Sequence, residues 1–86
     1  MPVVSRFYGI VIMMFFKDHN PPHFHAKYEG QIAIFNIQTH RLIAGKLPPH
    51  AVKLVKEWLK GHEKELMENW TRAQSDRQLK TIEPLE

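Results

Sequence analysis

The chain changes its hydrophobic period once, near residue 48, and this change limits the folds that it can adopt. Before that point, apolar residues alternate with polar ones or form short runs between turn-forming residues, which is typical of β-strands. After it, apolar residues recur every third or fourth position, which predicts one amphipathic helix over about residues 49–73. Pro49 suits the first position of that helix. Its apolar stripe consists of Val52, Val55, Leu59, His62, Leu66, Trp70 and Ala73.

Several segments before residue 48 have the composition of strands. Residues 7–16 are apolar on both faces and predict a central strand, which the turn formers of residues 18–22 end. Residues 23–29, 31–37 and 41–45 predict three more strands, the first two joined by a tight turn at Glu29-Gly30, and an edge strand near residues 2–4 is an additional candidate. We therefore predict an α+β fold, a small curled antiparallel sheet of four to five strands followed by one long C-terminal amphipathic helix.

The length and composition indicate a single domain that works in a reducing compartment. Residues 1–86 suffice for one domain, with a β-rich part over 1–47, the helix over about 49–73 and a polar tail over 75–86. The chain has no cysteine, which excludes disulfides and cysteine-ligated zinc. Its longest apolar run, residues 7–16, is far shorter than the ~20 residues of a membrane helix, so we expect no membrane association and a cytoplasmic location. A formal charge of +3 permits contact with nucleic acid without requiring it.

Three histidines within seven residues form the clearest candidate site. His23 and His25 lie on one face of a predicted strand, and the turn around Pro21-Pro22 can bring His19 beside them. Neutral imidazole is a common metal ligand, and three of them leave zinc, nickel or iron an open position for water. Glu29 shares the face and completes a His-x-His-x-x-x-Glu spacing, which matches the first metal motif of cupins. The second cupin motif and the cupin strand count are absent from this chain.

Other interpretations of the same histidines remain open. Lys27 shares the face of the strand and would repel a cation. An imidazole also suits metal-free acid–base chemistry on RNA or phosphate, with Asp18 orienting a ring, or it can bind an anion or lie on a half-solvated sheet face. Arg6 and Tyr8 are expected near the sheet face that carries the histidines, where they would stabilise charge. The candidate catalytic set is therefore Arg6, Tyr8, His19, His23 and His25.

Several stretches of the chain resemble the prokaryotic family called domain of unknown function 4160. They are Ser5-Arg6-Phe7-Tyr8-Gly9-Ile10, the segment from Asp18 to Ala26, Glu57-Trp58, Glu68-Asn69-Trp70 and Ile82-Glu83-Pro84-Leu85. The resemblance implies a small cytoplasmic protein that pairs with a small protein encoded by a neighbouring gene, in a toxin–antitoxin-like arrangement. It supplies no catalytic residues. Two hypotheses follow, a toxin-like RNase or phosphate-chemistry module that uses the histidines, and a non-catalytic binding module. The sequence leaves open whether the protein is an enzyme.

Overall fold

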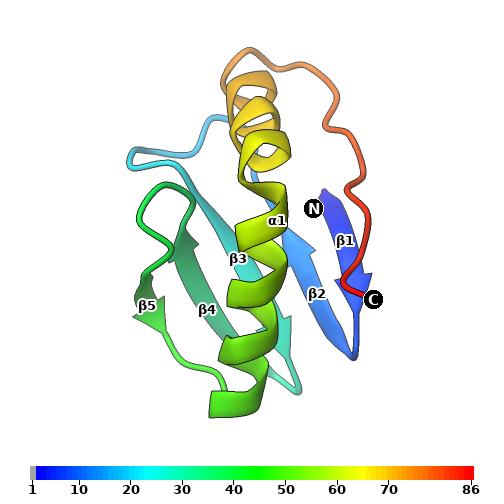
Figure 1. The fold of residues 1–86 in the computed structure, drawn as a ribbon. Helices are drawn as coiled ribbons and strands as arrows, with labels where there is room; N and C mark the ends of the chain where they lie inside the picture. Colours follow the sequence, from blue (N-terminus) through cyan, green and yellow to red (C-terminus); the bar gives the residue numbers. More distant parts are fainter. Residues whose placement is uncertain (1) are drawn as a thin grey trace.

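The computed structural model describes residues 2–86 as five strands followed by one helix, which lies across one face of the sheet (Figure 1). This arrangement confirms the predicted α+β class and the order of its elements. The strands are β1 (Val3–Phe7), β2 (Ile10–Met13), β3 (His23–Tyr28), β4 (Gln31–Asn36) and β5 (Leu42–Gly45), and the helix is α1 (Pro49–Gln74).

Each strand pairs antiparallel with the strand before it and the strand after it, so that the sheet is a simple meander in the order β1-β2-β3-β4-β5. Ala26 on β3 pairs with Ile12 on β2, and both side chains are fully buried on the face that α1 covers. Side chains alternate between the two faces of a strand. His25 therefore points to the opposite face, in one row with Met13 and Ile34.

The prediction of one central strand over residues 7–16 is wrong, because the chain reverses at Tyr8-Gly9. Both residues have positive φ angles, 50° and 80°, as expected of a two-residue type I′ hairpin turn. Apolar residues flank this turn on both sides, so the hydrophobic pattern does not reveal it. The edge strand expected near residues 2–4 is the start of β1. The predicted turn at Glu29-Gly30 is present, with φ angles of 46° and 81°.

Helix α1 begins one residue after Pro48 and carries one irregularity. His62 has φ −132° and ψ 20°, which breaks the helical geometry directly after Gly61, a residue type at which helices often bend. The helix otherwise presents one buried stripe to the sheet, close to the predicted one. This stripe consists of Ala51, Val55, Trp58, Leu59, Leu66, Asn69, Trp70 and Ala73.

The segment after α1 runs back past the helix to the outer edge of β1 (Figure 1). The backbone N–H of Ile82 donates a hydrogen bond to the carbonyl of Val4 over 2.7 Å, and the Ile82 side chain is buried in the core. The amide of Asn69 donates to the carbonyl of Lys80 and accepts from its N–H, over 2.8 and 2.9 Å. The tail is therefore fastened to both the helix and the sheet.

Candidate functional site

Three side chains of metal-ligand type meet at the end of the sheet where β3 begins. Asp18 comes from the loop between β2 and β3, and His23 and His25 come from β3 itself. One carboxylate oxygen of Asp18 and one ring nitrogen of each histidine all lie within 4.8 Å of one another. Within residues 2–86 this is the only group of three such side chains at ligand spacing. We refer to it as the Asp18–His23–His25 cluster.

The loop that carries Asp18 is attached to the C-terminal end of α1. The backbone N–H of Lys17 donates to the carbonyl of Ala73 over 3.1 Å. The side-chain amide of Gln74 donates to the carbonyl of Asp18 over 2.8 Å. These two contacts span more than fifty residues of sequence, and they hold the loop against the helix end so that the Asp18 carboxylate turns toward β3.

His23 is held on both sides of its ring. Nδ1 lies 2.7 Å from the carbonyl oxygen of Pro21, and Nε2 lies 2.9 Å from Oδ2 of Asp18. A backbone carbonyl only accepts hydrogen bonds, so Nδ1 carries a proton and Nε2 faces the carboxylate. The ring is 5% exposed and packs against Trp70 with ring centroids 5.2 Å apart. This hydrogen bond to a carbonyl is the support that metal-binding imidazoles commonly receive.

His25 is half-buried between two other rings. Its centroid lies 4.6 Å from that of Phe15 in an edge-on contact and 5.5 Å from that of His23. Its Nδ1 atom is buried and has no hydrogen-bond partner within residues 2–86. Burial, followed by the neighbouring His23, lowers the pKa of the His25 ring below its ordinary value of 6.5. The ring is therefore neutral near pH 7, the form that ligates metal.

The Asp18 side chain is 18% exposed and ionised. Burial works to raise its pKa, but the hydrogen bond from the His19 backbone N–H, over 2.9 Å, and the charge and hydrogen bond of His23 outweigh that effect. The pKa of Asp18 is accordingly lowered from its ordinary value of 3.8. The carboxylate is thus an anionic ligand over the whole physiological pH range.

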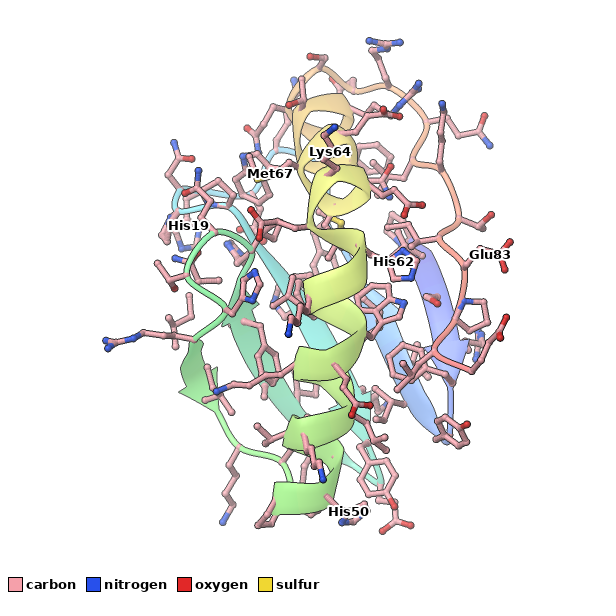
Figure 2. The ribbon with its side chains drawn as sticks, in the orientation of Figure 1. His19, His50, His62, Lys64, Met67 and Glu83 are labelled. Atoms are coloured by element: carbon pink, nitrogen blue, oxygen red, sulfur yellow. The ribbon has the colours of Figure 1, made fainter. Side chains whose placement is uncertain are left out.

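His19 lies beside the Asp18–His23–His25 cluster but outside it. Its side chain is 89% exposed, and it projects from the loop away from the helix (Figure 2). Its Nδ1 lies 3.0 Å from Oδ1 of Asp18, and its ring centroid is 5.7 Å from that of His23. Of the three predicted histidines, the buried His23 and the half-buried His25 belong to the cluster, and the exposed His19 only contacts the Asp18 carboxylate that His23 also contacts.

The structure places Glu29 away from the cluster. Glu29 occupies the turn between β3 and β4, at the far end of the strand that begins with His23, and it is exposed. The spacing of His23, His25 and Glu29 gives a common strand face only while the strand continues, and the positive φ of Glu29 ends it. Asp18 supplies the carboxylate instead. The sequence offered Asp18 only as a residue that orients an imidazole.

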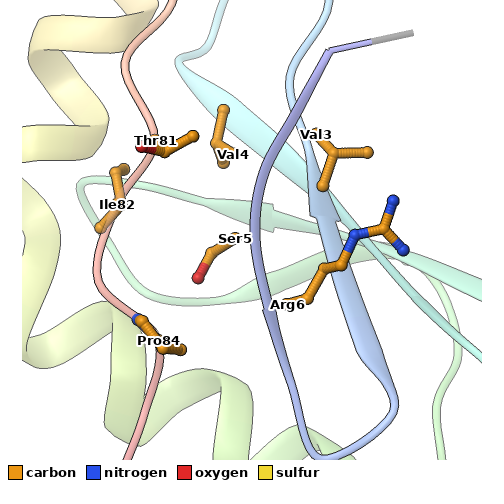
Figure 3. A pocket seen from close by; sticks show the side chains of 7 residues that line it. All are labelled: Val3, Val4, Ser5, Arg6, Thr81, Ile82 and Pro84. Carbon is orange, nitrogen blue, oxygen red and sulfur yellow. The ribbon is translucent and has the colours of Figure 1, made fainter.

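Arg6 and Tyr8, the other two candidate catalytic residues, also lie apart from the cluster. Tyr8 is 61% exposed in the turn between β1 and β2, at the opposite end of the sheet from His23. Arg6 pairs with Val11, and strand β2 separates it from β3. Arg6 and Ser5 both line a groove of about 340 Å³ between β1 and the tail, and their side chains extend to opposite sides of β1 (Figure 3).

The other histidines each have a polar partner. His40 contacts Glu63 over 2.6 Å, and His62 contacts Glu65 over 2.6 Å. His50 lies 3.2 Å from the hydroxyl of Tyr28. These pairs satisfy the rings without any ligand. The buried, unpartnered nitrogen of His25 therefore stands apart from the rest of the described histidines.

Two imidazoles and one carboxylate are a donor set that suits divalent transition metals. Zinc and non-haem iron are often held by two histidines and one carboxylate with further positions open to water or substrate. The cluster offers this combination with one ring supported by a backbone carbonyl and one ring kept neutral by burial. The arrangement is chemically able to hold a cation and to expose it at the end of the sheet.

Comparison with known proteins assigns the family. Residues 9–71 match the sequence model of a family described as a domain of unknown function (DUF4160). The chain belongs to this family. The match covers β2 to β5, the loop with Asp18 and most of α1, so the Asp18–His23–His25 cluster lies entirely inside it. Comparisons with curated proteins and with solved structures gave no significant match.

Within residues 2–86, α1 lacks the long apolar stretch needed to cross a bilayer, and this is the sole helix that the structure describes.

Proposed function

We propose that this protein binds one divalent transition-metal ion, zinc, iron or nickel, through Asp18, His23 and His25. The single observation that carries this proposal is the approach of one oxygen and two ring nitrogens within 4.8 Å of one another. Three protein ligands leave the remaining coordination positions to water or to a substrate. A divalent ion held by Asp18, His23 and His25 would lower the pKa of a bound water and so supply the hydroxide that hydrolysis of a phosphate ester needs at neutral pH.

The hydrogen-bond pattern around His23 supports a cation between the two side chains. Because Nδ1 donates its proton to Pro21, a neutral His23 turns an unprotonated Nε2 toward the Asp18 carboxylate. Two acceptors 2.9 Å apart repel each other unless a proton or a metal ion is shared between them. The buried Nδ1 of His25, which has no partner within residues 2–86, is a further polar atom that the described residues leave unsatisfied.

Burial favours metal binding over metal-free acid–base chemistry at the same residues. A general acid or base must reach the proton that it transfers, whereas His23 is 5% exposed beneath Trp70. A metal ligand needs no such access, because the ion presents the reactive positions. Lys27 is exposed and has room to turn its ammonium group into solvent, which reduces the repulsion that it would exert on a cation.

The direct test is metal titration of the apo protein by calorimetry, with elemental mass spectrometry for stoichiometry. We expect close to one equivalent of Zn²⁺ or Co²⁺ in the wild type and a loss of affinity of at least 100-fold in His25→Ala and in Asp18→Ala. Co²⁺ should give visible absorption bands of a site with nitrogen and oxygen ligands. His50→Ala removes a histidine that contacts only Tyr28 and serves as the matched control.

Equal metal binding by the wild type and His25→Ala, or equal loss in His50→Ala, would contradict the proposed site. Circular dichroism of each variant separates a lost ligand from a lost fold. His25→Gln keeps much of the ring volume and gives a second, milder variant at the same position.

The family resemblance supports a biological setting for such a site. We place the protein in a two-gene, toxin–antitoxin-like system in which it pairs with the product of a neighbouring gene, and RNA is the candidate substrate of the metal-bound water. Induced expression should then arrest growth, and co-expression of the neighbour should relieve the arrest. His25→Ala should abolish arrest and RNA cleavage; arrest that persists in this variant argues against catalysis at the cluster.

A further inference from the structure

The sheet has two faces, and α1 covers only one of them (Figure 1). The cross-strand pairs place a second set of side chains on the other side, where the described chain supplies no covering helix. Ile32 is 46% exposed there, and Val11 and Ile34 are half-buried. We call this surface the open face. Its docking positions are Arg6, Val11, Lys27, Ile32, Ile34 and Ala44; the buried Met13 and the half-buried His25 lie in the same row as Ile34, toward the Asp18–His23–His25 cluster.

The charged side chains that the strands place on the open face are both cationic, and the Asp18 carboxylate lies at one end of this face beside His25. Arg6 and Lys27 both pair with Val11, one from each side, so they lie in the same row across the sheet. Both are exposed, and neither forms an ion pair within residues 2–86. None of the five strands contains an aspartate or a glutamate. An occupant that pairs with Arg6 and Lys27 must therefore bring the negative charge.

This combination discriminates between possible occupants. A second copy docked face to face would offer Arg6 and Lys27 no acidic strand residue, because none of the five strands contains one. A nucleic acid would gain two phosphate contacts, but its backbone would leave the exposed Ile32 without an apolar partner. A protein surface with both apolar and acidic side chains matches all six positions. The backbone groups of the strands already form hydrogen bonds with neighbouring strands, so the partner would contact side chains and not the backbone.

We propose that the open face docks an amphipathic helix of a partner protein whose apolar stripe is flanked by aspartates or glutamates. The occupant would form a third layer, as α1 forms the first, with the sheet between them. Five strands spaced about 4.8 Å apart span roughly 19 Å, which exceeds the ~10–12 Å diameter of a helix. The apolar stripe covers Val11, Ile32 and Ile34, while the acidic flanks pair with Arg6 and Lys27. This inference does not depend on the metal proposal.

The test uses two synthetic helical peptides of about twenty residues with the same leucine stripe, one flanked by glutamate and one by lysine. Each is titrated into ¹⁵N-labelled full-length protein, and amide shift changes are mapped. We expect the glutamate peptide to perturb the open-face residues of β2, β3 and β4 and to bind at least tenfold tighter than the lysine peptide. Arg6→Glu/Lys27→Glu should reverse that preference, and the exposed substitution Ile32→Ser should weaken binding of both peptides.

Lys53→Glu/Lys56→Glu makes the same charge change on α1 and is the matched control, expected to leave the preference for the glutamate peptide unchanged. Several outcomes would overturn the proposal. These are no binding of the glutamate peptide, equal binding of the two peptides, or shift changes centred on α1. Dimerisation without peptide that depends on Ile32 would assign the face to a second copy of the chain. Binding of polyuridylate that is tighter than binding of the glutamate peptide, and that is lost in Arg6→Glu/Lys27→Glu, would assign the face to RNA.

Discussion

Oδ2 of Asp18 lies 2.9 Å from Nε2 of His23, in a contact between the loop that joins β2 to β3 and the first residue of β3. The imidazole cannot rotate away from the carboxylate, because its other nitrogen lies 2.7 Å from the carbonyl oxygen of Pro21. The ring is therefore oriented before any ligand arrives. Such preorganisation lowers the cost of binding, because the His23 side chain need not be ordered at that moment.

The ionisation of Asp18 should report this contact directly. Its pKa is lowered from 3.8, with the backbone N–H of His19 and the ring of His23 outweighing the effect of burial. A carboxyl pKa below its unfolded value stabilises the fold above that pH, and the stabilisation disappears as the pH falls through the folded pKa. We expect the ¹³C shift of the Asp18 carboxyl to titrate below pH 3.8 in the apo protein and closer to 3.8 in His23→Ala. An unchanged midpoint in that variant would show that His23 does not stabilise the carboxylate.

Metal should stabilise the fold through His25 far more than through His19. A ligand at 100 times its dissociation constant adds about 2.7 kcal/mol to the free energy of unfolding. We expect this increase, measured as a rise in melting temperature with Zn²⁺, to vanish in His25→Ala. His19 is 89% exposed and outside the cluster, so His19→Ala should keep most of the rise. Equal losses in both variants would mean that His19 is a ligand as well.

Asn69 should anchor the C-terminal tail. Its buried amide makes two hydrogen bonds with the backbone of Lys80, and each contributes about 1 kcal/mol. Asn69→Ala should therefore lower the free energy of unfolding in guanidinium by about 2 kcal/mol or more. Lys80→Ala keeps both backbone groups and removes only an exposed contact with Glu68, so a change of under about 0.5 kcal/mol is expected. Comparable losses in the two variants would assign the effect to the lysine side chain.

Two glycines with similar backbone angles should respond differently to alanine. Gly45 and Gly30 have φ of 74° and 81°, a conformation that costs an alanine about 1 kcal/mol. At Gly45 the added Cβ would also lie 2.1 Å from the carbonyl oxygen of Ile32, whereas nothing lies within 4 Å at Gly30. We expect Gly45→Ala to destabilise the protein by about 3 kcal/mol or more and Gly30→Ala by about 1 kcal/mol. Similar values in chemical unfolding would show that β4 and β5 separate to make room.

The sequence alone predicts the fold class because its signals are local. Pro48-Pro49 marks the start of the helix, the three- to four-residue period predicts one stripe, and Glu29-Gly30 predicts a hairpin turn. The turn at Tyr8-Gly9 is missed because the residues on both sides of it are equally apolar, so no change in pattern marks the reversal. Its only local signal is the glycine that tolerates the positive φ.

The candidate site is also predictable from the sequence only in part. His23 and His25 share a strand face by simple alternation, so their proximity follows from the sequence. The identity of the third ligand does not follow from the sequence, because Asp18 and Glu29 both lie within a few residues of these rings along the chain and either one is a candidate carboxylate. The hydrogen bonds from Lys17 to Ala73 and from Gln74 to Asp18 turn the Asp18 carboxylate toward the rings. The hairpin turn between β3 and β4 takes Glu29 away from them. Contacts between residues more than fifty positions apart leave no periodic trace, and for that reason only the tertiary structure decided which carboxylate completes the cluster.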